Sequence, residues 1–545
     1  MKLKRAIISC YDKKGLIELG AALQKQDVEI LSTAGTLKHL QENNIAVKDI
    51  SEISERGEAF GGRIKSLSFG VSAGLLFDRV SDAQEAQNLG VKSIDLVVCN
   101  LYPFDQASQD DFVRWIDIGG PTMLRAASKN YEFVSVLCDP KNYANFIEEL
   151  EKSGGTISLE TRKHLMRKTF SYMADYDCQI STALDKWAGE DSLRLSFSNK
   201  KPLRYGENSH QKADYFESTS QLFMKNMQVH QGKELSYNNL LDVQAAFDAI
   251  RDLKNQACCI IKHCTPCGIA QSSSQVEAFK LAWASDPVSA FGSIVVFSSV
   301  VDKQTVEQFS KKFVEIIAAP SFSHEALELL RTQKNLRVIT YDPNIKASKQ
   351  EIRLIDGGAL VQERDLESAS KREWVTDCHP ALDAGSSAGS RLVGRDDKQA
   401  RGDNMGLSDS LLEFGLHCIR PMKSNAIALV RTLENGSFQL LGMGCGQPNR
   451  IHSVKLAVER ATDGLTAEYQ GHPSEQDAYI QHHLSRAVLI SEAFFPFSDS
   501  IDVCHEAGIK TIVQPGGSMR DKQVIEACNQ HGISMMFVGN RHFKH

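Results

Sequence analysis

The chain has 545 residues, of which 42% are hydrophobic, and its 62 basic and 68 acidic side chains give a formal net charge of −6. This length predicts several domain-sized units with substantial cores, and the balanced charge excludes the broad basic surface that non-specific binding to nucleic acid or anionic membranes requires. The sequence has neither an apolar stretch of about 18 residues nor a signal-peptide core, which predicts a cytoplasmic protein.

The first part of the chain alternates between short apolar runs and amphipathic stretches. Strands are predicted at residues 6–9, 28–32, 96–99 and 133–137, and helices at 14–24, 37–43, 122–128 and 141–152. Strands that alternate with helices in this way pair in parallel, with helices on both faces of the sheet. An α/β domain with a parallel sheet is therefore expected here.

A turn rich in hydroxyl groups, Ser32-Thr-Ala-Gly-Thr36, joins the second predicted strand to a helix. Its hydroxyls, its backbone N–H groups and the positive end of the helix dipole suit a bound phosphate. A simple helix N-cap needs only one Ser or Thr and explains part of the same pattern. Both interpretations stay open at this point.

Polar side chains collect where the predicted strands end. Asn100 and Tyr102 follow one strand, and Asp117 precedes a helix that ends at Lys129. Lys65 lies in a further polar segment. Because the carboxyl ends of parallel strands share one edge of a sheet, the sequence predicts a ligand cleft at that edge.

A polar stretch at 190–201 follows a long helical region and predicts a domain boundary, with one domain at 1–195 and a second at 196–545. The second domain opens with the loop 203–211, which gathers a guanidinium, a phenol, a carboxylate and an imidazole around Gly206. Buried charges are costly unless they are paired, so this is either a solvated loop or a binding loop.

The segment 257–270 carries the main candidate residues of the second domain. Its apolar run predicts a buried strand that ends in Lys262 and His263, followed by the turn formers Pro266 and Gly268. An ammonium and an imidazole at the mouth of a strand have good access to a ligand. Taken alone, however, the dipeptide favours an ordinary surface loop.

The 13 cysteines are scattered, several of them inside apolar runs, which favours reduced, packed thiols over a disulfide framework. Cys264 and Cys267 have the spacing of a zinc-binding pair beside His263. A structural zinc site usually takes four ligands, and no second pair follows at a suitable spacing, so no structural metal is predicted.

Taken together, the motifs resemble those of the bifunctional purine-biosynthesis family in which AICAR formyltransferase is joined to IMP cyclohydrolase. The matching segments run nearly from end to end, at residues 32–36, 99–104, 117–130, 203–208, 262–268, 286–292, 423–426, 446–452 and 541–545. The resemblance implies an N-terminal domain of methylglyoxal-synthase-like fold and a C-terminal region of two cytidine-deaminase-like α/β subdomains without their zinc. It also implies a homodimer whose transferase sites draw on both subunits.

This resemblance implies the last two steps of de novo IMP biosynthesis. A formyl group passes from the co-substrate 10-formyltetrahydrofolate to the 5-amino group of AICAR, and the formyl-AICAR so formed closes its ring with loss of water to give IMP. The expected partners are therefore AICAR, formyl-AICAR, IMP and reduced folate, with no nucleic acid and no membrane.

For the transfer step, the resemblance implies that His263 is the general base for a poorly nucleophilic amine, a role suited to an unperturbed pKa of about 6.5. Lys262 stabilises the developing oxyanion or protonates the leaving folate nitrogen, and Asn425 orients the formyl group. The residues implied to hold nucleotide or folate are Arg204, Tyr205, Phe291, Lys423, Arg450, Phe497, Asp502 and Arg541.

Ring closure is intramolecular, so much of the task is to hold a near-attack conformer. The resemblance implies a catalytic set of Lys65, Tyr102, Asp117 and Lys129, in which the lysines stabilise the oxyanion and Asp117 or Tyr102 moves protons. The residues implied to bind the nucleotide substrate are Ser9, Lys13, Ser32, Thr33, Gly35, Thr36, Arg63 and Asn100.

Two segments depart from the family's pattern. Residues 68–74 stand where the family carries two His and a Lys, so the alternative function is a formyltransferase with weakened or lost cyclohydrolase. Residues 377–403 are rich in Gly, Ser, Ala and Asp without an apolar period, which predicts an exposed insertion whose deletion leaves transfer nearly intact. Two competing classes stay open: a zinc-dependent deaminase and a non-catalytic nucleotide sensor.

Overall fold

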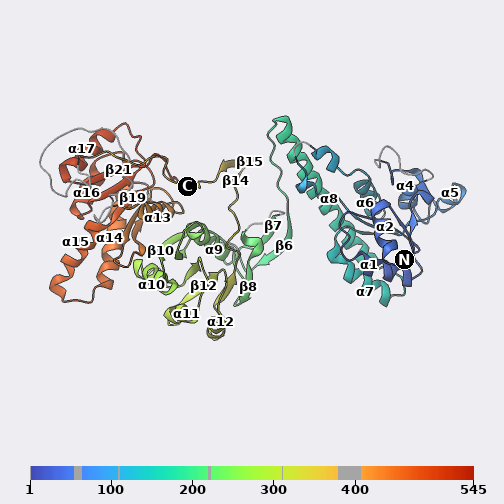
Figure 1. Ribbon diagram of the computed structural model, residues 1–545, viewed down its shortest axis with the longest axis horizontal. Coiled ribbons are helices and arrows are strands. Elements are labelled where there is room, and N and C mark those ends of the chain that lie inside the picture. Colours follow the sequence, from blue (N-terminus) through green and yellow to red (C-terminus); the bar gives the residue numbers. More distant parts are fainter. Residues whose placement is uncertain (1, 55–63, 109–110, 219–222, 310, 378–406) are drawn as a thin grey trace. The chain divides into compact units, whose positions relative to one another are not determined.

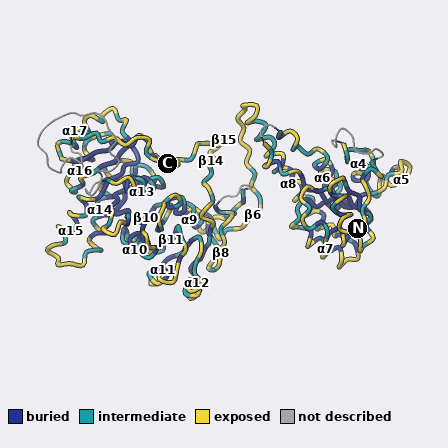
Figure 2. Tube along the Cα trace, viewed as in Figure 1, coloured by how far each residue is buried: buried dark blue, intermediate teal, exposed yellow. Residues whose placement is uncertain are grey.

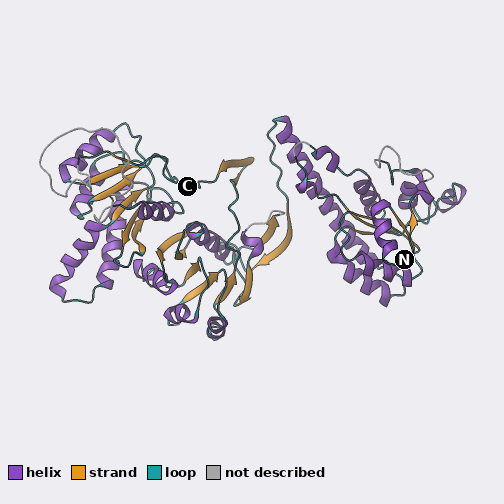
Figure 3. Ribbon diagram, viewed as in Figure 1, coloured by secondary structure: helices purple, strands orange, loops and turns teal. Residues whose placement is uncertain are grey.

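The computed structural model describes residues 2–54, 64–108, 111–218, 223–309, 311–377 and 407–545. The chain forms two compact units, unit 1 at Met1–Ser198 and unit 2 at Asn199–His545 (Figure 1). Both units combine helices and strands (Figure 3), and buried residues concentrate on the central strands of each (Figure 2). Among the described residues, every helix is too short or too polar to span a lipid bilayer.

Unit 1 is built on a five-stranded sheet in the order β3-β2-β1-β4-β5, in which every neighbouring pair is parallel. The strands are β1 (Arg5–Cys10), β2 (Glu29–Ser32), β3 (Lys48–Asp49), β4 (Leu96–Asn100) and β5 (Ser135–Leu137). β1 and β4 are buried along almost their whole length, as expected for parallel strands covered on both faces. The parallel α/β domain predicted from the alternating pattern is confirmed.

The α-helices described in unit 1 are α1 (Leu16–Lys25), α2 (Ala34–Glu42), α3 (Ser51–Ser54), α4 (Phe69–Leu76), α5 (Ala83–Asn88), α6 (Gly119–Lys129), α7 (Tyr143–Lys152) and α8 (Leu159–Ala188). α8 begins at the N-cap Ser158, whose side chain accepts a hydrogen bond from the N–H of Thr161, and ends at the left-handed Gly189. Two of its phenols accept backbone hydrogen bonds of 2.9 Å, Tyr172 from Leu101 and Tyr176 from Asp117. α8 therefore braces the loops that follow β4.

Unit 2 contains a twelve-stranded mixed sheet in the order β16-β21-β20-β19-β17-β18-β10-β9-β11-β12-β13-β8. Its first half comprises β8 (Gln228–Gln231), α9 (Tyr237–Ile250), β9 (Gln256–Lys262), β10 (Thr265–Ser272), α10 (Gln275–Ser285), β11 (Ser293–Phe297), α11 (Lys303–Phe309), β12 (Val314–Ala319), α12 (His324–Arg331) and β13 (Arg337–Thr340). Its second half comprises β16 (Glu373–Trp374), α13 (Asp409–Ile419), β17 (Ile427–Thr432), β18 (Phe438–Gly444), α14 (Arg450–Glu468), α15 (Gln476–Arg486), β19 (Val488–Ser491), α16 (Asp499–Glu506), β20 (Thr511–Gln514), α17 (Asp521–His531) and β21 (Ser534–Phe537).

The two halves repeat one plan. In each, an edge strand and a helix lead into an antiparallel hairpin, which is followed by three mutually parallel strands. The halves join through the antiparallel pair β10–β18 at the centre of the sheet. α9 and α13 pack against one face of the sheet and share one core. The other helices of each half pack with strand residues that face the opposite way, α10 to α12 in one core and α14 to α17 in another. The two α/β subdomains expected from the sequence are thus present, fused into a continuous sheet.

Glycine allows a helix to lie directly on a strand in each of the two halves. A Cβ on Gly268 of β10 would lie 1.9 Å from the carbonyl oxygen of Ala282 in α10. A Cβ on Gly444 of β18 would lie 2.0 Å from the carbonyl oxygen of Ser453 in α14. Any side chain at either position would push the helix off the strand.

The order of antiparallel pairs brings distant segments to one edge of this sheet. β9 ends, β17 begins and β19 ends at the same edge, because β9, β10, β18, β17 and β19 alternate in direction. We call this the site edge; it carries the segments 262–264, 423–426 and 491–492.

Outside the large sheet lie two hairpins, β6 (Phe197–Leu203) with β7 (Ala213–Ser218) and β14 (Gln350–Ile355) with β15 (Gly358–Glu363). The β14–β15 hairpin leaves the apolar side chains Ile352, Leu354, Leu360 and Val361 exposed, with Leu354 75% accessible. A two-stranded hairpin with such a surface is not stable in water on its own.

Candidate functional site

At the site edge, β9 delivers Lys262 and His263 into a tight turn. His263 and Cys264 both have left-handed backbones, with φ of 56° and 57°, and the N–H of Cys264 donates to Asp242 of α9 at 2.6 Å. A left-handed conformation costs a non-glycine residue roughly 1–2 kcal/mol, so this hydrogen bond helps to hold a strained turn. The turn leaves the His263 side chain exposed to solvent.

The ammonium of Lys262 is fixed next to an aromatic pair. Its Nζ donates to the carbonyl oxygen of Phe291 at 3.0 Å. The ring of Phe291 lies 5.1 Å from that of Phe313, and both rings are more than half exposed. Phe313 was not among the residues predicted from the sequence, where a lone Phe after two lysines carries no functional signal.

Asn425 lies immediately before β17 and is held on both sides of its amide. Its Oδ1 accepts from Nη2 of Arg450 at 2.9 Å, and its Nδ2 donates to the carbonyl oxygen of Gln447 at 2.8 Å. Arg450 is buried and paired with Glu492, which is fully buried as well. The structure therefore places Arg450 between Glu492 and Asn425, and its contact with ligand stays a prediction.

The other residues predicted for the transfer site lie in separate surroundings. Phe497 is half exposed beneath the guanidinium of Arg520, 4.4 Å from the ring centre, and Asp502 pairs with His531 at 2.9 Å. Lys423 is exposed at the site edge, and Arg541 lies 5.2 Å from the ring centre of Phe543 in the C-terminal tail.

Among the described residues, no hydrogen bond or ion pair joins Arg204 or Tyr205 to His263. The N–H of Arg204 donates to the carbonyl oxygen of Leu235, and both residues act electrostatically on Arg337 at the start of β13. β13 is three strands from β9, a separation of roughly 14 Å.

In unit 1, hydroxyls gather at the carboxyl edge of the parallel sheet. The hydroxyls of Ser9 and Thr33 are 2.8 Å apart, Ser32 donates to Ile8 at 2.6 Å, and Thr36 both donates to and accepts from the backbone of Cys10. Space around Gly35 is open, since an added Cβ would meet nothing within 4 Å.

Two further predicted residues brace the loop after β1. The N–H of Asp12 donates to the side chain of Asn100 at 2.8 Å, and Nδ2 of Asn100 donates back to the carbonyl oxygen of Asp12. Lys13 lies in the same loop, where its Nζ donates to the carbonyl oxygen of Tyr11 at 3.3 Å. Asn100 and Lys13 therefore lie against or within the loop that follows β1.

Asp117 lies at the N-terminus of α6 on the same edge. Burial raises its pKa above the usual range, while the N–H groups of Gly119 and Gly120 oppose that rise. Lys65 precedes Ser66, whose hydroxyl is 2.8 Å from where a Cβ of Gly119 would lie, and Tyr102 packs edge-on to Tyr11 with ring centres 5.6 Å apart. Ser66, which follows Lys65, thus lies against the start of α6, and Tyr102 and Asp117 both act electrostatically on Tyr176 of α8.

The position of Lys129 is set by the length of α6. Lys129 ends α6, an eleven-residue helix that starts beside Asp117, so their backbones are separated by roughly 15 Å along the helix axis. Arg63 lies outside the described residues, as does nearly all of the insertion predicted at 377–403. Residues 68–74, expected to be a changed loop, form the N-cap Ser68 and most of α4.

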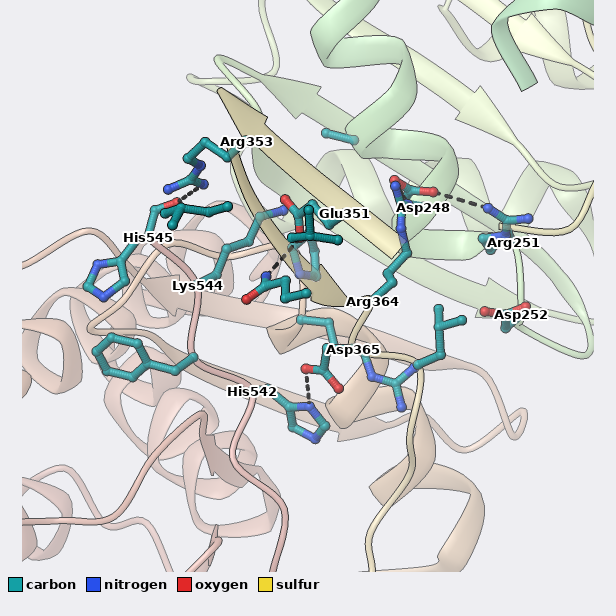
Figure 4. Close-up of a pocket in the computed structure, with 18 residues that line it drawn as sticks. Asp248, Arg251, Asp252, Glu351, Arg353, Arg364, Asp365, His542, Lys544 and His545 are labelled. Carbon is teal, nitrogen blue, oxygen red and sulfur yellow. Dashed lines mark hydrogen bonds and ion pairs between the residues drawn. The ribbon is translucent and has the colours of Figure 1, made fainter. Parts of the chain in front are cut away.

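A cavity of about 510 Å³ lies between α9, the β14–β15 hairpin and the C-terminal tail (Figure 4). Charged side chains line it, but many are paired with each other: Asp248 with Arg364 at 3.0 Å, and Asp365 with His542 at 2.7 Å. Nη2 of Arg353 donates to the carbonyl oxygen of His545 at 3.1 Å. These contacts anchor the tail next to the site edge, where the N–H of Ser424 donates to the carbonyl oxygen of Lys544 and the N–H of Lys544 donates to the hydroxyl of Ser424.

The cysteines that the structure describes are all free thiols. Burial raises the pKa of Cys264 to about 11 and that of Cys267 to about 12. Within the described ranges, no group of three or more His, Cys, Asp or Glu side chains is arranged to hold a metal ion.

Comparison with known proteins gives two family matches. The family described as "AICARFT/IMPCHase bienzyme" matches residues 127–460, and the one described as "MGS-like domain" matches residues 15–122 in the parallel-sheet unit.

Proteins named "Bifunctional purine biosynthesis protein PurH" match the chain over its full length. The one from Clostridium botulinum (strain Loch Maree / Type A3) is 41% identical over 100% of both chains. The one from Clostridium perfringens (strain 13 / Type A) is 42% identical over 99% of this chain and 100% of its own. A solved structure described as "Crystal structure of ForH" is 32% identical and covers 33% of this chain and 99% of its own, but its TM-score of 0.32 is too low to inform the fold.

Proposed function

This chain belongs to the AICARFT/IMPCHase bienzyme family, and from that membership we infer that it catalyses both formyl transfer to AICAR and ring closure of formyl-AICAR to IMP. The observation that carries this conclusion is the end-to-end identity of 41% with bifunctional relatives, which spans both units. The comparisons give no support to the alternative in which ring closure is weakened or lost.

For the transfer step, we propose 10-formyltetrahydrofolate as the co-substrate and His263 as the general base. As the 5-amino nitrogen of AICAR attacks the formyl carbon, the exposed imidazole accepts the amine proton, and the carbonyl electrons move onto the formyl oxygen. Collapse of the tetrahedral intermediate breaks the bond from carbon to the folate nitrogen, which takes up a proton. Lys262, held by the carbonyl of Phe291, is in place to stabilise the oxyanion or to supply that proton.

For ring closure, we propose that Lys65, Tyr102 and Asp117 act at the N-terminus of α6. The carboxamide nitrogen attacks the formamido carbon, and loss of water then completes the purine ring. The raised pKa of Asp117 suits a group that exchanges protons during these steps. The hydroxyl-rich turn at Ser32–Thr36 is the proposed phosphate cradle, because hydroxyls and helix N–H groups converge there.

We propose that the enzyme is a cytoplasmic homodimer with transfer sites shared between subunits. Two features support sharing: the exposed apolar hairpin β14–β15, and the separation of Arg204 and Tyr205 from His263 within one chain. A second copy would supply Arg204, whose planar fork suits the ribose phosphate.

The test measures the two reactions separately on purified protein. His263→Ala should abolish folate-dependent formyl transfer and leave conversion of supplied formyl-AICAR to IMP intact, whereas Lys65→Ala should do the reverse. His324→Ala, which removes an exposed imidazole from α12, is the matched control. A wild-type protein that binds AICAR without transferring a formyl group would be a sensor instead, and bound zinc in elemental analysis would indicate a deaminase.

A further inference from the structure

We propose that Glu492 is a positioning residue for formyl transfer. Acting through Arg450, it fixes the side-chain amide of Asn425 so that the amide presents a hydrogen-bond donor to the formyl oxygen. This inference rests on the proposed function and adds to it a residue that the sequence analysis did not single out.

Glu492 and Arg450 form a buried, two-pronged ion pair. Nη1 of Arg450 donates to Oε2 of Glu492 at 2.8 Å and Nη2 donates to Oε1 at 3.0 Å. Glu492 is completely inaccessible to solvent, and its Oε2 also accepts from the N–H of Ala426 at 2.7 Å. A buried charge without a partner is strongly destabilising, so this carboxylate fixes the guanidinium in one place.

The second N–H of Nη2 then sets which way the amide of Asn425 points. A guanidinium only donates hydrogen bonds and a backbone carbonyl only accepts them. The amide oxygen must therefore face Arg450 and the amide nitrogen must face the carbonyl of Gln447, as their distances of 2.9 Å and 2.8 Å show. The flipped amide would set donor against donor and acceptor against acceptor.

This arrangement uses one of the two N–H bonds on Nδ2 of Asn425. The other has no hydrogen-bond partner among the residues that the structure describes, and Asn425 is partly exposed at the site edge. When the formyl carbon becomes tetrahedral, its oxygen gains negative charge, and a donor already oriented toward it lowers the barrier without further rearrangement. Asn425 contacts the reacting group, whereas Arg450 and Glu492 act through it.

The first test is Glu492→Gln. It replaces one of the two carboxylate oxygens that accept from Arg450 by an amide nitrogen, which donates, and it removes the negative charge. We expect kcat for formyl transfer to fall by about a hundredfold, as for loss of one oxyanion donor, with KM values for AICAR and folate nearly unchanged. Ring closure by unit 1 of the same preparation should keep its rate. Glu506→Gln, at the exposed end of α16, is the matched control.

A double-mutant cycle separates positioning from general structural support. In an Asn425→Ala background, Glu492→Gln should cause little further loss of kcat, because the group through which it acts is gone. Equal losses in both backgrounds, or an unchanged kcat in the single variant, would overturn the inference. If Glu492→Gln does not fold, Arg450→Lys keeps a cation for Glu492 but cannot reach both partners, and the same selective fall in kcat is expected.

Failure of the proposed function gives a different result. A wild-type protein without formyl transfer refutes both the function and this inference. An active wild type whose Glu492→Gln variant retains full kcat refutes only the positioning role.

Discussion

Arg450 shows how far single residues can be interpreted from the sequence. An Arg in a Gly-rich segment before a helix predicts contact with an anion, but here its partner is Glu492, 42 residues further along the chain. The pairing depends on β17 and β19 being neighbours, which no local pattern reports. Lys262 and His263, in contrast, could be placed at a strand mouth because a fully apolar run precedes them.

His417 of α13 illustrates a residue-scale effect on stability. Burial lowers its pKa to about 4, assisted by the nearby guanidinium of Arg420, whose Nη1 is 3.4 Å from its Nδ1. Between about 6.5, the ordinary value, and about 4, the unfolded chain binds a proton that the folded chain excludes. Stability should therefore fall as pH is lowered through this window.

When the pH is lowered from 7 to 4.5, we expect the free energy of unfolding to fall less for His417→Gln than for the wild type, with a difference on the order of 2 kcal/mol. Denaturant unfolding at both pH values measures this difference. His324→Gln, on an exposed imidazole, should follow the wild type. An identical pH response in the His417 variant would contradict the assignment.

At the scale of elements, the alternation of strands and helices in unit 1 was predictable because parallel central strands are uninterrupted apolar runs. The two-residue β3 was not predicted, since it is too short and too exposed to leave a pattern. Helix length also separates two residues of one predicted set: Lys129 and Asp117 are close in sequence, yet their backbones lie at opposite ends of α6. The two α/β subdomains of unit 2 were expected from the family resemblance and not from local patterns, because the repeat lies in the order of elements.

The contact between β10 and α10 makes a sharp prediction for one glycine. Gly268→Ala would place a methyl group 1.9 Å from a helix carbonyl oxygen, so the strand and helix must separate. We expect a loss of roughly 3 kcal/mol or more in the stability of unit 2, measured by thermal unfolding. Gly358→Ala in the exposed β15 has no neighbour within 4 Å and should be nearly neutral. A stable, fully active Gly268→Ala protein would show that this packing is looser than described.

At the scale of the whole molecule, the β14–β15 hairpin shows the limit of sequence reasoning most clearly. The sequence analysis predicted no element here, and only the structure shows a hairpin that stays largely exposed within one chain. The proposed homodimer gives these side chains a partner, because association would bury apolar surface that is otherwise in water.

Introducing charge on this hairpin should therefore weaken association. Leu354→Asp together with Leu360→Asp is expected to shift the protein toward monomers in sedimentation velocity and to lower formyl transfer at low protein concentration. Ring closure should change less, since the proposed residues for it all lie in unit 1. Leu89→Asp, on an exposed Leu of unit 1, provides the control. A monomeric wild type that is fully active would remove the basis for shared sites.

The two halves of unit 2 share one arrangement of elements but differ at the position of Arg450. A rotation by half a turn about the β10–β18 pair superimposes one half on the other and exchanges the two rims of the sheet. Under this rotation, Arg450, the first residue of α14, corresponds to Gln275, the first residue of α10. There a neutral amide donates to the carbonyl of Ala257 and accepts from Ser299, and no ion pair forms. The buried ion pair of Arg450 and Glu492 thus has a neutral, hydrogen-bonded amide as its counterpart, and this position distinguishes the two halves of the scaffold.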